Sequence, residues 1–250
     1  MSRGATANLR TLAFGELDCA SWGAVWNPGG GGEVMISLGA GTEVATARVT
    51  IAGSSEREQW RLAGKGVDLV VSGEREAAQA RSDGACVGFD QLCRVSGRFA
   101  VGGEERVVDC PGRRGLRTAV DLDRCDSARD VSAWFGPDEG LALVSIRPRG
   151  STGHERDLVT AAAFDALRSV PVADPRLSTT YAAAGRPVRA SLELWLEDEQ
   201  SELYPQRTAG DSIGPGVDRL EGGFELHTTP IRWRGAGREG TGIYMLARSR

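Results

Sequence analysis

The sequence predicts an antiparallel all-β protein. Segments in which apolar and polar residues alternate recur through most of the 250 residues, and Gly, Pro, Asn and Asp residues bound these segments. The 34 glycines suit the many tight turns that short antiparallel strands require. With 40% hydrophobic residues the chain can build a core, and this fraction argues against a disordered protein.

The alternation places the strands in order along the chain. The most distinct pair is the hairpin of Phe89–Val101 and Glu104–Val108, because Gly102-Gly103 between them permits the positive φ angles of a tight turn. The expected strands are Thr11–Cys19, Glu33–Leu38, Thr42–Ile51, Gln59–Ala63, Val67–Ser72, Phe89–Val101, Glu104–Val108, Val131–Phe135, Leu141–Arg147, Ser191–Glu197, Phe224–Thr228, Ile231–Arg234 and Thr241–Ala247.

Four segments between these strands have a different character. Glu74–Arg81 contains good helix formers with a thin apolar face, and it is one of the few short helices expected. Asp157–Arg168 fits a helix or a strand, and the alternative stays open. Gly29–Gly32 lacks the strand and helix of a dinucleotide site and is interpreted as a flexible turn. Ser169–Pro187, with three prolines, is interpreted as a connector.

The chain is expected to divide into two β-barrel-like halves, residues 1–120 and 121–250, although a single domain is also compatible with this length. Trp22–Leu38 and Trp134–Ile146 are weakly similar in sequence, because each begins at a tryptophan and continues through glycines into an apolar strand. This similarity is compatible with a duplicated β-unit.

Charge and hydropathy argue against several classes of protein. The net charge of −4 and the isoelectric point near 5.4 disfavour a nucleic-acid-binding protein. No run approaches the roughly 18 to 20 apolar residues that a membrane span needs. The first ten residues lack the apolar stretch of a secretory signal, so the cytoplasm is the expected compartment.

The chain contains few residues that could bind a metal ion or act as a catalytic nucleophile. The five cysteines include no C-x-x-C pair and are expected to stay thiols in a reducing compartment. Only two histidines are present, His154 and His227, far apart in the sequence, which disfavours a metal site. No Gly-x-Ser-x-Gly motif suggests a hydrolase. We therefore expect neither metal nor cofactor.

Two stretches carry a family resemblance. Phe89–Glu105 leads through its glycine hairpin to Gly112-Arg113-Arg114, and Tyr181–Leu194 precedes Tyr204-Pro205-Gln206-Arg207. This order of short strings resembles the carotenoid 1,2-hydratase and AttH-like group of two-barrel, lipocalin-related proteins. The group continues its Gly-x-Arg turn with His or Arg and then Ser-Trp-Gly, whereas this chain has Gly115-Leu116-Arg117-Thr118.

The resemblance implies antiparallel lipocalin-like barrels that hold a small hydrophobic molecule. It also implies cofactor-independent chemistry on natural-product intermediates, namely cyclisation (including pericyclic cyclisation), hydration or isomerisation. A barrel interior suits such reactions because it excludes water and folds a flexible substrate into a reactive shape. The alternatives are a non-catalytic carrier that uses the same cavity and an interaction module. A homodimer is also left open.

Two predicted strands supply catalytic candidates. Glu193 and Trp195 share one face of Ser191–Glu197, and a carboxyl in a barrel cavity would have a raised pKa and act as a proton donor. Glu225 and His227 share one face of Phe224–Thr228. His227 is the best single acid–base candidate, because histidine exchanges protons most readily near neutral pH.

The third catalytic candidate is Asp18, a carboxyl ahead of two indoles that could protonate an alkene or stabilise a cation. Its alternative role is to bond to a turn. Arg113 heads a basic cluster that could bind a carboxylate or phosphate of a ligand. The expected substrate-binding residues are Trp22, Trp26, Trp134, Trp195, Tyr204, Trp233, Tyr244 and Arg113.

Overall fold

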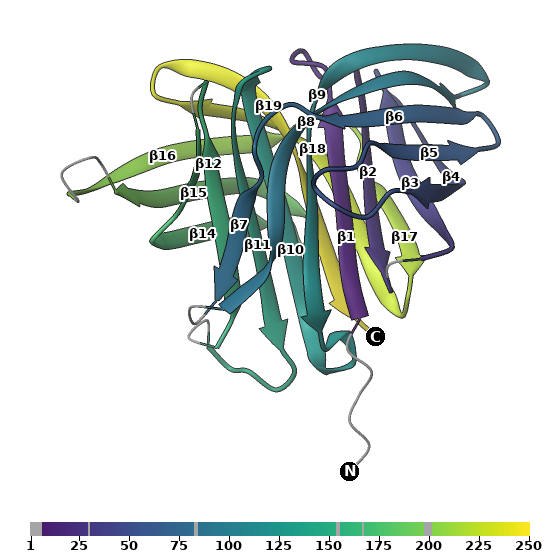
Figure 1. Cartoon of the computed structure of the whole chain (residues 1–250). Coiled ribbons are helices and arrows are strands. Elements are labelled where there is room, and N and C mark those ends of the chain that lie inside the picture. Colours follow the sequence, from purple (N-terminus) through teal and green to yellow (C-terminus); the bar gives the residue numbers. More distant parts are fainter. Residues whose placement is uncertain (1–6, 30, 83–84, 154–155, 167, 198–201) are drawn as a thin grey trace.

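The described residues of the protein lie almost entirely in strands. The computed structural model describes residues 7–29, 31–82, 85–153, 156–166, 168–197 and 202–250. The strands form two antiparallel sheets, one from each half of the chain (Figure 1). The one helical turn among these residues is a 3-10 turn, η1 (Leu122–Arg124), between the sheets. The predicted antiparallel all-β class is confirmed.

The N-terminal sheet closes into a barrel. Its strand order is β6-β5-β4-β3-β2-β1-β9-β8-β7, and β6 also pairs with β8, so eight strands form a ring and β7 lies outside it. The bounds are β1 (Ala7–Gly15), β2 (Ser21–Pro28), β3 (Glu33–Ala40), β4 (Glu43–Ala52), β5 (Trp60–Gly64), β6 (Val67–Gly73), β7 (Ala78–Ser82), β8 (Ala85–Val101) and β9 (Glu104–Val120).

Strand β8 pairs first with β7 and then with β6. Two glycines in β8 allow this change of partner, on which closure of the ring depends. Gly97 has a φ of 132°, and a Cβ there would lie 2.2 Å from the Asp68 carbonyl oxygen. Gly88 has a φ of 140°, and a Cβ would lie 1.8 Å from the Leu116 carbonyl oxygen. Only glycine permits this backbone and this close approach, so β8 can bend from one partner strand to the next.

Side chains fill the barrel interior. Phe14 packs edge-on against Phe99 with 6.3 Å between ring centroids, and Trp60 packs edge-on against Phe89 at 6.5 Å. None of the four is more than 3% exposed. The closed barrel is therefore a packed hydrophobic core around these rings. The aliphatic side chains around them include Leu12, Val25, Ile36, Leu38, Leu62, Leu69, Val71 and Val95.

The C-terminal sheet is an open half-barrel. Its order is β13-β12-β11-β10-β19-β18-β16-β15-β14, with β17 paired to β18. Four strands separate β10 from β14 in this order, yet Arg129 of β10 donates a hydrogen bond to Tyr181 of β14. The sheet must therefore curl, and the face that carries Arg129 and Tyr181 is concave. The bounds are β10 (Cys125–Gly136), β11 (Glu139–Pro148), β12 (Leu158–Phe164), β13 (Ser169–Pro171), β14 (Asp174–Tyr181), β15 (Pro187–Glu197), β16 (Leu203–Ser212), β17 (Val217–Glu221), β18 (Phe224–Gly235) and β19 (Arg238–Ser249).

The two sheets meet between the outer face of β1 and β2 and the convex face of β10, β18 and β19. Trp22 and Trp26 enter this contact from β2, and Trp134 enters it from β10; none is more than 2% exposed. Trp26 packs edge-on against Phe224 at 6.4 Å. Large aromatic side chains bury the most apolar area per residue, so these indoles stabilise the packing of one half on the other.

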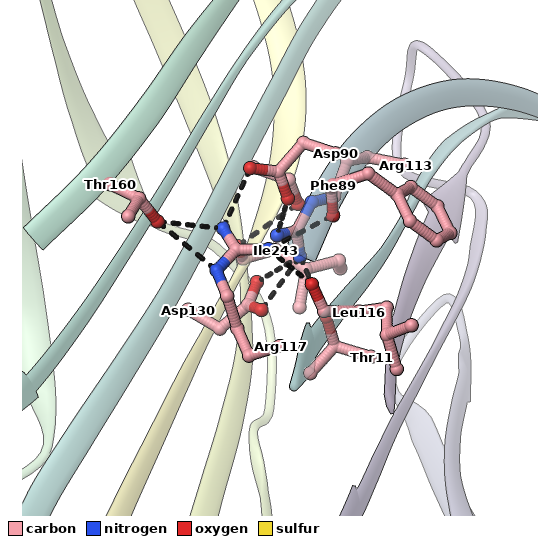
Figure 2. A network of polar contacts seen from close by, with 10 residues as sticks. Thr11, Phe89, Asp90, Arg113, Leu116, Arg117, Asp130, Thr160 and Ile243 are labelled. Atoms are coloured by element: carbon pink, nitrogen blue, oxygen red, sulfur yellow. Dashed lines mark hydrogen bonds and ion pairs between the residues drawn. The ribbon is translucent and has the colours of Figure 1, made fainter. Parts of the chain in front are cut away.

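A buried ion network crosses the same contact (Figure 2). Arg113 of β9 donates to Asp90 of β8 and, at 2.6 Å, to Asp130 of β10. Arg117 donates to Asp90 at 2.7 Å and to Thr160 of β12 at 2.8 Å. The two arginines and two aspartates are at most 2% exposed. Their charges cancel, so the network ties the barrel to the second sheet without leaving a net buried charge.

Gly115 leaves the space that this network occupies. A Cβ at Gly115 would lie 2.8 Å from both Arg113 Nη2 and Asp90 Oδ1. The first and third residues after the Gly-x-Arg turn, Gly115 and Arg117, therefore have a structural role here. The Ser-Trp-Gly of the resembling group is replaced by a stretch whose glycine and arginine complete the ion network.

Asp90 contributes to the dependence of the free energy of unfolding on acidic pH. Burial raises the pKa of its carboxyl, but the charges of Arg113 and Arg117 and their hydrogen bonds lower it below its usual range. Since the unfolded pKa is about 3.9, the ionised carboxyl stabilises the fold above that pH, and this contribution is lost as the pH falls through the lower folded pKa.

We therefore expect the urea midpoint of unfolding to fall as the pH is lowered from about 5 to about 3. The fall should be shallower in Asp90→Asn. Equal pH slopes for the two proteins would contradict this assignment.

Three sequence predictions about local structure are corrected. Glu74–Arg81 does not form a helix: its second half is β7, with Ala78 and Ala80 buried, because β8 extends beyond β6 and pairs with another strand there. Asp157–Arg168 contains strand β12, so the strand alternative is right. Ser169–Pro187 is not a plain connector, since it contains β13 and β14. β14 is an edge strand, where proline is tolerated.

Strand β2 has no counterpart among the predicted strands. Seven of its eight residues are buried, so it shows no alternation of polar and apolar residues. β1 ends at Gly15, earlier than expected, and residues 16–19 form a turn. The turn at Gly29–Gly32 includes Gly30, which lies outside the described residues.

Candidate functional site

Two adjoining hollows open on the concave face of the C-terminal sheet, and we call them together the groove. The first has a volume of about 400 Å³ and the second about 310 Å³, and both are lined by Leu246 and Arg248 of β19. The first is also lined by Ala184, Gly185, Arg186, Asp218, Arg219, Leu220, Glu225, Leu226 and His227. The second is also lined by Asp126, Ser127, Arg129, Arg147, Tyr181 and Ser249.

A histidine–carboxylate pair lies in the first hollow. His227 of β18 stands opposite Asp218 of β17 in the ladder, and its Nδ1 lies 2.6 Å from Asp218 Oδ1. Arg186 also donates to the Asp218 carboxylate. Among the described residues no group is hydrogen-bonded to His227 Nε2, and 12% of the side chain is exposed.

The electrostatics keep this pair oriented. Burial raises the pKa of Asp218, but the hydrogen bond and charge of His227 and the charge of Arg186 lower it below its usual range. An ionised carboxylate at Nδ1 holds a proton on that nitrogen and leaves Nε2 as a proton acceptor. The arrangement is that of a general base with its orienting group.

The barrel holds β17, and with it Asp218, in place. Alternate residues of β17 point in opposite directions, so Arg219 and Glu221 face β3. Arg219 donates to Ser37 Oγ at 2.5 Å and to the Met35 carbonyl at 3.0 Å, and the Met35 amide donates to Glu221 at 3.0 Å. Burial lowers the pKa of Arg219 to about 10, against the opposing charge of Glu221. The N-terminal half thus positions a residue of the groove.

Tyr181 lines the second hollow, and Tyr244 interacts with Tyr181. The Tyr181 hydroxyl accepts a hydrogen bond from Arg129 Nε at 3.1 Å, and Tyr244 shares one with Thr179 at 2.9 Å. Burial raises the pKa of Tyr181, but the hydrogen bond and charge of Arg129 lower it below its usual value. Burial and the charge of Tyr181 raise the pKa of Tyr244. Tyr181 is therefore the more acidic phenol.

The chain has only three tyrosines, so a spectrophotometric titration can test this difference. We expect one phenol to ionise below the ordinary value of about 10 and one well above it. Tyr181→Phe should remove the early transition and Tyr244→Phe the late one. Arg129→Gln should move the early transition upward. An early transition that persists in Tyr181→Phe would contradict the assignment.

Glu193 and Trp195 lie on the convex face, away from the groove. Glu193 accepts hydrogen bonds from Arg207 at 2.7 Å and from Trp195 Nε1 at 3.0 Å. These bonds lower the pKa of Glu193, so the expectation of a raised pKa is wrong. The leucines of β15 take the concave face, and Glu193 therefore lies on the other face, in a hollow of about 610 Å³ that Arg176 and Arg207 also line.

Asp18 lies in the turn after β1, where its carboxylate accepts a hydrogen bond from the Ala20 amide at 2.9 Å. This is the turn-bonding alternative. Trp22, Trp26 and Trp134 lie in the contact between the two sheets. They are separated from the groove by the C-terminal sheet, because that contact is on its convex face.

The remaining substrate-binding candidates are spread over the molecule. Trp233 is buried on the concave face and donates from Nε1 to the Ser132 carbonyl at 3.1 Å. Tyr204 is 46% exposed on β16. Arg113 is fully buried between two aspartates. Of the predicted residues, His227 lines the groove and Tyr244 interacts with Tyr181, which lines it, while His154 lies outside the described residues.

Sequence reasoning missed Asp218, Arg186, Tyr181, Arg129 and Arg248. One signal could have found Asp218: the Gly222-Gly223 pair forms a tight turn with φ angles of 54° and 84°. A hairpin about that turn places Asp218 opposite His227. No group of three or more potential metal ligands gathers among the described side chains, and none of the helices there is long and apolar enough to cross a membrane.

Comparison with known proteins gives structural matches alone. No family model matches the chain, and neither does any curated protein. CghA matches with a TM-score of 0.63 and 12% identity over 97% of this chain and 88% of that chain. Kievitone hydratase from Nectria haematococca matches with a TM-score of 0.63 and 10% identity, covering 98% and 90%.

An AttH-like protein from Nitrosomonas europaea has a TM-score of 0.63 and 11% identity, covering 98% of this chain and 93% of that chain. Identities at this level establish the fold and no more. The structural part of the resemblance predicted from the sequence is confirmed, and the chain has the two-barrel, lipocalin-like fold of CghA, kievitone hydratase and the AttH-like protein.

Proposed function

We propose that the protein is a cofactor-independent enzyme that acts on a small hydrophobic natural-product intermediate in the groove, by cyclisation, hydration or isomerisation. The observation that carries the proposal is the His227–Asp218 pair, because a histidine oriented by a carboxylate and lining a hollow is a general acid–base arrangement. The volumes of the two hollows fall within the range of about 300 to 1,000 Å³ that small-molecule sites occupy.

The groove offers a proton acceptor and a proton donor. His227 Nε2 accepts a proton, and Tyr181, acidified by Arg129, gives one up more readily than an ordinary phenol. In a hydration, His227 takes a proton from water as the oxygen bonds to one carbon of a polarised double bond, and Tyr181 protonates the other carbon. Solvent then restores both side chains. Isomerisation needs the same two transfers without the water.

The structural relatives support this class of chemistry. One of them is named a hydratase, and CghA has been crystallised with the compound Sch210972. A shared fold hosts many functions, so the site carries the proposal and the relatives add to it.

Mass spectrometry of reaction mixtures tests the proposal. The protein is incubated with a panel of unsaturated, hydrophobic acyclic and phenolic compounds in the absence of added metal and cofactor. We expect a product of unchanged mass, from cyclisation or isomerisation, or a product that has gained one water. Heat-denatured protein is the control. Tight binding of panel compounds without any conversion would instead support the carrier alternative.

A further inference from the structure

We propose that Arg248 binds an oxyanion of the ligand, so that the groove takes an organic anion such as a carboxylate or an ionised enol on an apolar body. The inference deepens the proposed function, on which it rests for the identity of the groove as the substrate site. Arg248 lines both hollows and so lies where they adjoin.

The Arg248 guanidinium is held in place from two sides. Its carbon lies 5.7 Å from the centroid of the Tyr181 ring, and its Nη2 donates to the Gly185 carbonyl at 2.7 Å. A Cβ at Gly185 would lie 2.7 Å from Arg248 Nη1, so the group rests closely on this glycine. An ordered guanidinium loses less conformational entropy when it binds an anion.

The other exposed arginines that stack on rings have carboxylate partners. Arg176 lies over Trp195 and pairs with Asp174 at 2.7 Å, and Arg238 lies over Phe135 and pairs with Glu139. Arg248 forms no ion pair with any described residue. Its charge is therefore available to a ligand, unlike the charges of Arg176 and Arg238.

The neighbouring carboxylates mostly have other partners. Asp218 pairs with His227 and Arg186, and Glu225 pairs with Arg250 at 3.2 Å. Asp126 is the one carboxylate in the lining of the second hollow, which also contains three arginines. Two of these arginines, Arg129 and Arg147, pair with the buried Asp157, so Arg248 supplies the positive charge of the second hollow that has no carboxylate partner among the described residues.

Apolar side chains next to Arg248 suit the rest of such a ligand. Leu220 and Leu246 line the first hollow with it. A guanidinium binds a carboxylate through two parallel N–H bonds, which fixes the orientation of the ligand. The anion would then lie at the junction of the hollows, with its apolar body toward the leucines and His227.

Binding of matched probes tests the inference. We titrate the full chain with octanoate, with its neutral analogue octanamide and with inorganic phosphate, and measure affinity by calorimetry. Octanoate should bind about tenfold more tightly than octanamide, as expected for a hydrogen bond to a charged group. Arg248→Gln should abolish this preference and Arg248→Lys should recover part of it. Arg176→Gln, at the stacked arginine outside the groove, should leave it unchanged.

The outcomes separate the two proposals. Equal affinities for octanoate and octanamide, no binding of either probe, or a preference that survives Arg248→Gln in a protein with an unaltered circular dichroism spectrum would overturn the anion site. Arg248-dependent binding of phosphate without octanoate preference would assign the site to free inorganic anions and overturn the organic ligand class. Conversion of substrates by a protein that lacks the preference would leave the proposed enzyme standing, whereas the preference without any conversion would leave only the anion site.

Discussion

Replacement of Asp130 by alanine is expected to lower the free energy of unfolding by about 3 to 5 kcal/mol. Asp130 is fully buried and accepts from Arg113, which is also fully buried. Without this carboxylate, two buried arginines share Asp90 alone, and one positive charge is left without compensation in a region that water does not reach. The effect is large because the partner cannot move into solvent.

Urea unfolding of the variant and of the unaltered chain measures this difference. The control is Asp109→Ala, which breaks an ion pair with Arg94 on the surface of the barrel, where both side chains are about half exposed. Asp109→Ala should lower the free energy of unfolding by only a small fraction of the loss expected for Asp130→Ala, because water solvates the remaining Arg94. Joint replacement Arg113→Met and Asp130→Leu should recover much of the loss, since no unpaired charge remains. Equal effects of Asp130→Ala and Asp109→Ala would contradict the account of the network.

His227→Ala is expected to lower the turnover rate of the proposed reaction by about 100- to 10,000-fold, the range for a lost general acid–base group. Asp218→Asn should also lower turnover, because the carboxylate that holds a proton on Nδ1 and orients the imidazole is lost. Binding of the substrate should change little in either variant. Rates measured with substrate in excess, and affinity measured separately, distinguish catalysis from binding.

The matched control is Glu105→Gln, on an exposed hairpin of the barrel. Its turnover rate should equal that of the unaltered chain. Glu193→Gln and Asp18→Asn should also retain activity, because Glu193 is bonded to arginine on the convex face and Asp18 to a turn. Turnover that survives His227→Ala but not Glu193→Gln would move the active site to the convex face.

Local sequence patterns predicted the parts of the fold that depend on nearby residues. The Gly102-Gly103 turn joins two strands that pair residue by residue from Val101–Glu104 outward, as expected. The alternation in Ser191–Glu197 also correctly placed the leucines on one face. Which of the two faces was concave could not be predicted, because curvature arises from contacts such as that of Arg129 with Tyr181, 52 residues apart.

The candidate site was only partly predictable for the same reason. His227 is identifiable by its chemistry, since few residues of the chain can exchange protons near neutral pH. Arg113 was expected to bind a ligand because it stands in a local basic cluster. Its partners could not be seen in that cluster, since Asp90 comes from the neighbouring strand β8 and Asp130 meets Arg113 only when the two sheets pack. Arg248 lay at the end of a predicted strand with no local feature to mark it. Its role depends on Gly185 and Tyr181, which another segment supplies.

The most direct test of the account is to observe where a substrate or product binds. The chain contains only two histidines, so the imidazole signals in an NMR spectrum can be assigned with His227→Ala. We predict that a bound substrate or product shifts the His227 signals together with those of the Tyr181 ring, which line the two hollows. Shifts confined to Trp60 and the other rings inside the closed barrel, with His227 and Tyr181 unmoved, would contradict the account.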